Sequence, residues 1–196
     1  MSDDRDRALE PTTEEEMERV HIGAVTQHNG RITLVDYDPE WPRQFEAVAR
    51  KVRAALGERA VVLEHAGSTS VPGLCAKPII DIVLAVPDSR DEQAYVPDLE
   101  AAGFPLHIRE PEWFEHRLFK YHDPNVNMHV FSAGCSEIDR MLLMRDWMRS
   151  HPEDRDLYAT TKRDLAQRTW KYTQHYADAK STVVAEIMAR AAASRQ

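Results

Sequence analysis

The apolar residues of this chain follow two spacings, one typical of helices and one of strands. Between Trp41 and Gly57 they recur at three- and four-residue steps, which predicts an amphipathic helix opened by Trp41-Pro42 and ended by Gly57. Short continuous apolar runs at 61–65 and 79–86 instead predict two buried strands.

The same patterns assign most of the remaining chain and indicate the fold class. Further strands are predicted at 32–35, 117–121 and 127–131, the last two as a hairpin around Asp123-Pro124-Asn125. Further helices are predicted at 95–102, from Ser136 to about Ser150, and over 153–170 and 173–193. Strands followed by a run of helices predict an α+β fold, a mixed β-sheet with flanking helices and a helical C-terminal half.

This order also predicts the domain organisation. Residues 1–28 are expected to be an acidic, partly disordered N-terminal extension, and 29–196 a single domain. Within that domain, the mixed sheet is expected in 29–134 and the helical part in 135–196.

Charge is concentrated at the N-terminus. Residues 1–20 hold eight acids and three arginines, which is most of the net charge of −8. Residues 1 to about 12 are predicted to be a disordered tail, followed by a short helix capped by Thr12 or Thr13 that ends at Arg19 or Val20. The rest of the chain is nearly neutral and has no basic stripe, so duplex nucleic acid is not an expected partner.

Composition limits the classes of protein further. Hydrophobic residues make up 42% of the chain, but no apolar run approaches the roughly 20 residues that cross a bilayer, and no membrane partner is expected. The first residues lack the apolar segment of a signal peptide. The two cysteines, Cys75 and Cys135, are widely separated and are expected to be reduced, in a cytoplasmic setting.

The region between the two predicted buried strands has the strongest chemical signal. Gly67-Ser68 follows the first strand, and Asp81 lies among aliphatic residues in the second. A Gly-Ser turn can bring backbone N–H groups against a phosphate, and a carboxylate on the next strand can hold its divalent cation. Each feature also has a structural interpretation, a tight turn that requires glycine and an ion pair of Asp81 with a lysine or arginine.

This region resembles the signature of the GrpB family. The resemblance rests on Gly-Ser-Thr-Ser-Val-Pro-Gly-Leu at 67–74 and Ala-Lys-Pro-Ile-Ile-Asp at 76–81. It extends over roughly 31–185, through the segments 35–42, Met128-His129-Val130, and 145–152 with Tyr158 and Lys162. The resemblance implies a nucleotidyltransferase-like fold.

Three groups of candidate residues follow from the motif and the resemblance. The catalytic candidates are Asp81, Lys162 and Arg145. The candidates for binding nucleotide phosphates are Gly67, Ser68, Thr69, Ser70, Lys77, Arg117 and Lys120. The candidates for holding a metal are Asp81, Glu64 and His129.

Two positions depart from the pattern of the fold and the family. Nucleotidyltransferases usually carry a second carboxylate two positions after the first, and here that position is Val83. The family often has His-x-His on its central strand, and here the first histidine is replaced by Asn127. Because two-metal catalysis relies on bridging carboxylates, a second acid must come from elsewhere or a single metal binds.

Three functions are therefore weighed. The first is a Mg²⁺-dependent nucleotidyltransferase or adenylate-forming enzyme, with a nucleoside triphosphate, expected to be ATP, and a small acceptor that the sequence does not identify. The second is an inactive nucleotide- or CoA-binding module, because the resemblance brings an association with dephospho-CoA kinase. The third is a metal-dependent hydrolase using His129, His122 and Asp81. The oligomeric state is left open.

Overall fold

The computed structural model describes residues 11–194, whose strands form a five-stranded sheet and a two-stranded sheet. The strands are β1 (Gly30–Arg31), β2 (Val62–Ala66), β3 (Ile80–Val86), β4 (Leu106–Glu110), β5 (His116–His122), β6 (Asn125–Ser132) and β7 (Thr169–Trp170). The helices are α1 (Glu14–Val20), α2 (Trp41–Leu56), α3 (Val96–Ala101), α4 (Ser136–Ser150), α5 (Pro152–Ala166), α6 (Thr173–Asp178) and α7 (Ser181–Ala193). Short 3₁₀ turns are η2 (Gly57–Arg59), η3 (Ser68–Ser70) and η4 (Glu92–Ala94).

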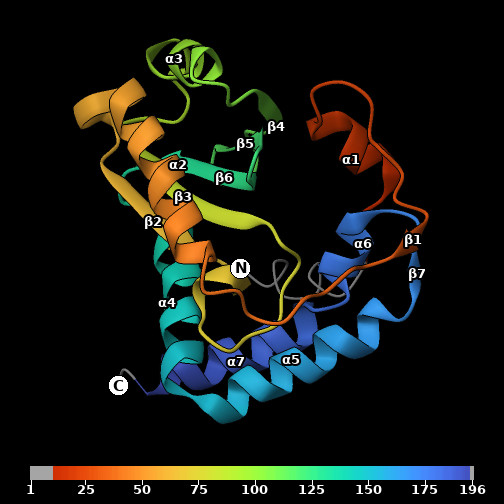
Figure 1. Cartoon of the computed structure of the whole chain (residues 1–196). Coiled ribbons are helices and arrows are strands. Elements are labelled where there is room, and N and C mark those ends of the chain that lie inside the picture. Colours follow the sequence, from red (N-terminus) through yellow and green to blue (C-terminus); the bar gives the residue numbers. More distant parts are fainter. Residues whose placement is uncertain (1–10, 195–196) are drawn as a thin grey trace.

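The larger sheet has the strand order β2-β3-β6-β5-β4 (Figure 1). Its central pair, β3 and β6, is parallel, and every other neighbouring pair is antiparallel. The sheet is therefore mixed, and helices α4 to α7 follow it in the chain. This arrangement confirms the predicted α+β fold with a helical C-terminal half.

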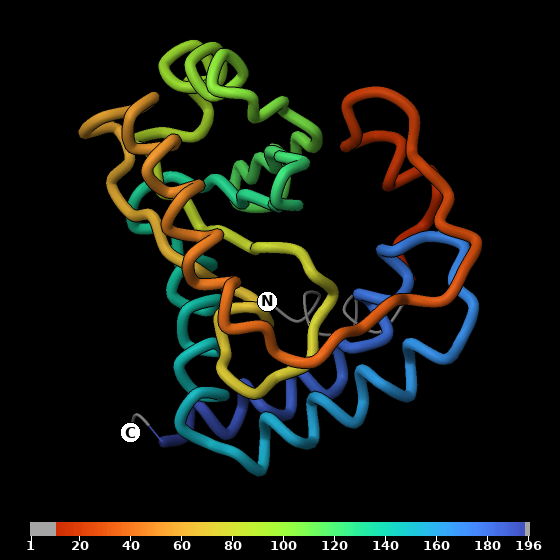
Figure 2. Tube along the Cα trace, in the orientation of Figure 1, coloured from red at the N-terminus to blue at the C-terminus, as the bar shows by residue number. Residues whose placement is uncertain are grey.

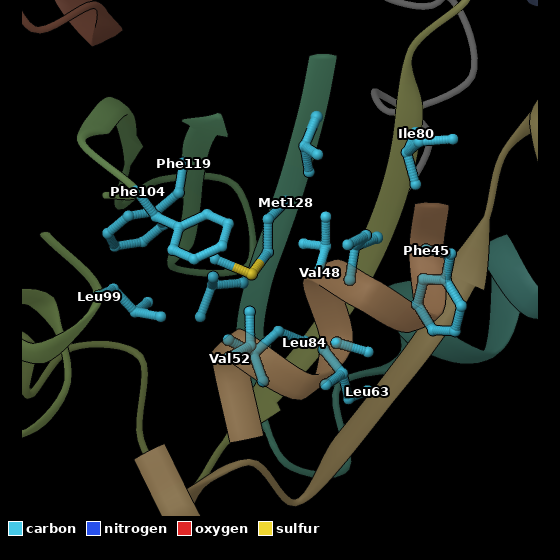
Figure 3. Close-up of a cluster of buried hydrophobic side chains, with 14 of the residues drawn as sticks. Phe45, Val48, Val52, Leu63, Ile80, Leu84, Leu99, Phe104, Phe119 and Met128 are labelled. Carbon is cyan, nitrogen blue, oxygen red and sulfur yellow. The ribbon is translucent and has the colours of Figure 1, made fainter. Parts of the chain in front are cut away.

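Alternation along β3 builds a core on each face of the sheet. Ile82 and Leu84 face α2 and α3, where they are fully buried with Val48 and Val52 of α2 (Figure 3). The odd-numbered residues of β3 face the opposite side because successive strand residues alternate. There Val83 and its neighbours pack against α4. Asp81 lies on this second face, near the N-terminal end of β3.

The loop after η3 joins the sheet to the helical half. Val71, Leu74 and Cys75 are buried among residues of α4, α5 and α7, including Tyr158 and Ile187. The signature segment is therefore held in a core of its own between the sheet and the C-terminal helices. Figure 2 shows the chain between β1 and α2 passing alongside the same helices.

The N-terminal helix α1 packs onto the domain rather than extending from it. Thr13 and Glu16 form the predicted capping box, so this helix is confirmed. His21 bridges to Ile108 of β4, and the backbone N–H of Thr12 donates to Asp178 of α6 at 2.8 Å. The segment therefore connects the edge of the sheet to the helical half. Most of the predicted tail lies outside the described residues.

One predicted strand is wrong, and one strand of the structure was not predicted. The strand expected at 32–35 is absent as such: pairing is confined to β1 and to one bridge between Val35 and Ala76. The loop at Ala76 comes from the signature segment, so this pairing depends on tertiary structure. Conversely, β4 was not predicted, although Leu106 and Ile108 alternate with polar residues.

Two predicted C-terminal helices are shorter than expected. The helix predicted over 153–170 ends at Ala166, because Thr169 and Trp170 pair with β1 as β7. The helix predicted over 173–193 divides into α6 and α7 at Ala179 and Lys180. No glycine or proline marks that break, so local propensity could not predict it.

Between residues 11 and 194, no helix combines the length and the apolar character that crossing a bilayer requires.

Candidate functional site

The turn after β2 packs directly on Asp81. Gly67 has φ 63°, in the left-handed region that glycine adopts without strain. A Cβ atom at position 67 would lie 2.2 Å from Oδ2 of Asp81, a distance that real Cβ contacts do not allow. Only glycine therefore lets the backbone of the turn approach this carboxylate so closely.

Asp81 is the acid at the centre of the site. It stands opposite Ala66 of β2 and Asn127 of β6, and Nδ2 of Asn127 donates to its Oδ1 at 3.3 Å. Burial raises the pKa of Asp81, and nearby lysines, Lys77 first, act against that increase. The carboxylate therefore needs a cation or a donor to stay ionised.

Lys162 reaches the signature turn from α5. Its Nζ donates to Oγ of Ser68 at 3.0 Å and also to the backbone carbonyl of Cys75. The residue is only 2% exposed, and burial lowers the pKa of Lys162 to about 7. Tyr158, whose ring centroid lies 4.8 Å from Nζ of Lys162, is hydrogen-bonded to the same serine.

Two further lysines approach Asp81 past the ring of Tyr176. Nζ of Lys180 lies 4.7 Å from the ring centroid, and Nζ of Lys77 lies 5.7 Å from it. Burial lowers the pKa of Lys77 to about 8, with repulsion from Lys180 as the next cause, and burial also lowers the pKa of Lys180. Tyr176 is 1% exposed, and its hydroxyl has no hydrogen-bond partner among residues 11–194.

Lys77, Lys162 and Lys180 form a lysine cluster around Asp81. All three interact electrostatically with its carboxylate, so one acid faces three cations. Burial and mutual repulsion destabilise the charged lysines in the absence of another anion. A phosphate placed there would stabilise them, and this arrangement suits the binding of a polyanion.

The three predicted metal ligands face the same side of the sheet but are engaged by different partners. Val83 lies in register between Glu64 on β2 and His129 on β6. Oε2 of Glu64 accepts from Arg145 at 2.8 Å, and Nδ1 of His129 is 3.1 Å from Nε2 of His116. Within residues 11–194, no three acids, histidines or cysteines gather as a metal site.

Among the described residues, Asp81 offers a single carboxylate to any metal ion bound beside the turn. Mg²⁺ is commonly held by one or two carboxylates together with substrate phosphates and waters. Asp81 supplies one carboxylate, and Val83 occupies the position where the second would stand. If one Mg²⁺ ion binds here, Asp81 would be its carboxylate ligand, and a second ion would lack one.

His129 ends a short hydrogen-bonded chain. His116 links it to Glu110, whose Oε2 lies 2.6 Å from Nδ1 of His116. Burial lowers the pKa of His129 to about 3, so its imidazole is neutral at physiological pH.

The remaining cationic candidates lie in different surroundings. Lys120 pairs in register with Asn127, and so lies on the face of the sheet that carries Asp81. Arg117 faces the other side, where its Nε donates to Glu92 at 2.6 Å. Arg145 donates to Glu64, Asp146 and the carbonyl of His65. The structure thus brings Lys120 toward the cluster and holds both arginines in ion pairs away from it.

Thr69 and Ser70 stabilise the turn from inside. Oγ1 of Thr69 donates to the carbonyl of Ile79 at 3.2 Å, and Oγ of Ser70 donates to the carbonyl of Gly67 at 2.6 Å. His65 bonds Thr69 and stacks on Phe45, and it lies on the face of the sheet opposite to Asp81. Two hydroxyls of the signature segment are therefore already used by the protein.

Tyr176 was not identified from the sequence. A tyrosine among helical residues gives no chemical signal by itself. Its four-residue spacing from Lys180 was the one available hint, because such pairs share a helix face. The break between α6 and α7, which falls between these two residues, is what sets their relative position.

The fold and the site together define an α+β protein in which one carboxylate, near the start of β3, faces the buried Lys162 and the half-buried Lys77 and Lys180. Residues 31–190 match the GrpB protein family, and the chain belongs to this family.

Relatives and a solved structure agree with that assignment. A UPF0157 protein of Halalkalibacterium halodurans is 59% identical over 184 residues, which cover 94% of each chain. The crystal structure of the conserved protein GrpB from Enterococcus faecalis is 28% identical and has a TM-score of 0.71, covering 81% of this chain and 96% of that one. A dephospho-CoA kinase of Mycolicibacterium paratuberculosis is 30% identical over 70% of this chain and 40% of its own length.

Proposed function

We propose that the chain binds a nucleoside triphosphate, ATP in the first instance, through its phosphates at the lysine cluster, and transfers the nucleotidyl group to a small acceptor in a Mg²⁺-dependent reaction. The observation that carries the proposal is the convergence of Lys77, Lys162 and Lys180 on Asp81 beside the Gly67 turn. One buried and two half-buried lysines facing one acid favour a polyanion over any neutral ligand.

Each residue has a defined part in this proposal. Lys162, fixed by Ser68 and the carbonyl of Cys75, would hold the phosphates in place. Lys77 and Lys180 would offset the charge that develops on the leaving pyrophosphate when the bond between the α-phosphorus and the bridging oxygen breaks. The hydroxyl of Tyr176 is a free donor in the same surroundings.

Mg²⁺, when bound at Asp81, would neutralise phosphate charge and polarise the phosphoryl oxygens. The contribution of the chain itself is positioning and a preorganised positive field. We further propose a cytoplasmic setting, which is supported by two cysteines, Cys75 and Cys135, that are both free.

A specific observation also favours the second function, a nucleotide- or CoA-binding module without catalysis. Val83, which pairs with Glu64 and His129, stands where nucleotidyltransferases carry their second carboxylate. The carboxylate of Glu64 is itself paired with Arg145. The similarity to part of a dephospho-CoA kinase is compatible with such a module. The two functions share the phosphate site and differ in turnover.

A thermal-shift panel separates these functions. The chain is heated with each nucleoside triphosphate and with coenzyme A, with and without Mg²⁺, and pyrophosphate release is then assayed with candidate acceptors. The transferase predicts a Mg²⁺-dependent shift with one nucleotide and pyrophosphate release, whereas the module predicts a Mg²⁺-independent shift and none.

Asp81→Asn should abolish the Mg²⁺-dependent part of the shift. Asp164→Asn, at an exposed position of α5, is the matched control and should behave as wild type. If no nucleotide or coenzyme A shifts the melting temperature, both functions are wrong.

A further inference from the structure

A second site lies on the other side of the signature turn, at the edge of β2. A cavity of about 480 Å³ is lined by Arg145, Arg149 and Arg155. Its apolar wall includes Tyr37, Pro42 and Phe45. This arginine pocket is separate from the lysine cluster, because none of the three lysines lines it.

Two of the three arginines are occupied by the protein. Arg145 is paired with Glu64 and Asp146. Nε and Nη2 of Arg149 both donate to the carbonyl of Ser70, at 3.0 and 2.8 Å, and its Nη1 lies 3.4 Å from Asp146. These two side chains build the wall of the pocket and hold the turn.

Arg155 is different, because its guanidinium is only weakly engaged. Its Nε is buried and has no hydrogen-bond partner among residues 11–194. The single bond that Nη1 makes, to the carbonyl of Pro72, is long at 3.5 Å. The nearest acid, Asp156, is 3.9 Å from Nε and 78% exposed. A buried donor on a permanent cation is costly to leave unpaired.

We propose that the arginine pocket binds a small organic acid, with its carboxylate on Arg155 and its apolar body against Phe45 and Pro42. A guanidinium fork matches a carboxylate in geometry and charge. A monoanion fits because Asp156, the acid paired with Arg155, is exposed and 3.9 Å away, and Glu46 and Glu64 on the lining disfavour a dianion. The volume and the aromatic wall suit an acid with a ring or a branched chain.

This site does not depend on nucleotide binding, so it can be tested on the full chain alone. Phenylacetate is titrated into the protein and followed by isothermal calorimetry, with phenylacetamide as the uncharged analogue and phenyl phosphate as the dianionic one. We expect phenylacetate to bind at millimolar concentration, phenylacetamide not to bind, and phenyl phosphate to bind more weakly.

Two variants locate the binding. Arg155→Met should weaken phenylacetate binding by about tenfold or more, whereas Arg163→Met, an exposed arginine on the same helix, should leave it unchanged. Glu46→Gln leaves the arginines intact and should strengthen binding by about two- to threefold through reduced repulsion.

Absence of phenylacetate binding to the wild-type chain would overturn the proposal, as would binding that Arg155→Met and Glu46→Gln leave unchanged. Tighter binding of phenyl phosphate than of phenylacetate would overturn the assignment to a monoanion.

Discussion

At the scale of single residues, burial of Lys162 destabilises its charged form, and a bound anion would offset that cost. Lys162 is almost completely enclosed, yet its ammonium group has only a hydroxyl and a carbonyl as hydrogen-bond partners. Burial of a cation without a paired anion destabilises a folded protein. A ligand phosphate would supply the missing anion, which is the physical reason for placing the phosphates here.

The burial of Lys162 predicts a specific pH dependence of stability. Its pKa falls from 10.5 in the unfolded chain to about 7 in the folded one, so between these values the unfolded state holds a proton that the native state has lost. The free energy of unfolding therefore rises with pH in this window, by about 2 kcal/mol from pH 7 to pH 9 for this group. Urea denaturation of Lys162→Met should lack this increment, whereas the exposed control Lys51→Met should keep it. Equal pH slopes for wild type and Lys162→Met would contradict the assignment.

Gly67 provides a test of the close approach to Asp81. Gly67→Ala should lower the free energy of unfolding by more than about 2 kcal/mol and abolish nucleotide binding, because the new methyl group meets Asp81. Gly134 also has positive φ, 81°, but its Cβ would meet nothing within 4 Å, so Gly134→Ala should cost only the backbone strain of about 1 kcal/mol. Chemical denaturation compares the two, and equal losses would show that Asp81 does not constrain the turn.

The sequence predicted the residues of the turn better than their surroundings. Gly67 before Ser68, and Asp81 within an apolar strand, can be recognised from the sequence alone. The pairing of Arg117 with Glu92 and of Arg145 with Glu64 could not be recognised, because these partners lie far apart along the chain. Pairings of that kind are decided by the fold.

At the scale of elements, α4 positions the signature turn. Arg149 on α4 donates twice to the carbonyl of Ser70, and Arg145 on the same helix donates to the carbonyl of His65. Together they hold the backbone on both sides of Gly67, at His65 and at Ser70. Packing of α4 against the sheet is therefore linked to the geometry of the proposed phosphate site.

Loss of the hydrogen bonds between Arg149 and Ser70 should weaken nucleotide binding, although Arg149 is not part of the lysine cluster. Arg149→Met removes both donors to Ser70, so we expect ATP affinity to fall by about fivefold or more while Lys162 remains in place. Arg149→Lys should restore little, because an ammonium lacks the planar fork. Calorimetric titration of ATP measures the effect, with the exposed Arg43→Met as the matched control. Wild-type affinity in Arg149→Met would show that α4 does not position the turn.

Most helices and strands were predictable because their signals are local. The three- and four-residue spacing on α2 and the hairpin of β5 and β6 needed no tertiary information. By contrast, β1 and β7 are two residues each and exist only because they pair with one another. The division between α6 and α7 likewise has no local marker.

At the scale of the whole molecule, the site exists only where the two parts of the chain meet. Asp81 and Asn127 come from the sheet, Lys162 from α5, and Lys180 from the break between α6 and α7. The N-terminal segment also spans both parts, through contacts with β4 and with α6. The sequence predicted α1 but not that it would pack onto the domain.

Docking of α1 predicts that the extension contributes to stability. Met17 is 2% exposed, so Met17→Ala should lower the free energy of unfolding by about 2 kcal/mol in a single cooperative transition. Glu18→Ala, at an exposed position of the same helix, should change it by less than about 0.5 kcal/mol. Unchanged stability of Met17→Ala in thermal and urea unfolding would mean that α1 is not part of the cooperative unit.

We propose that Lys162, which is buried, and Lys77, which is half-buried, are partly deprotonated and receive the phosphates of a nucleotide. Calorimetric titration of ATP near pH 8, in two buffers that differ in ionisation enthalpy, tests it most directly, because the difference in heat gives the number of protons bound. Phosphates should raise the pKa of Lys162 and Lys77 from about 7 and about 8, so the account predicts net proton uptake in the wild type and a smaller uptake in Lys162→Met. Absence of ATP binding, or binding without proton uptake, would contradict it.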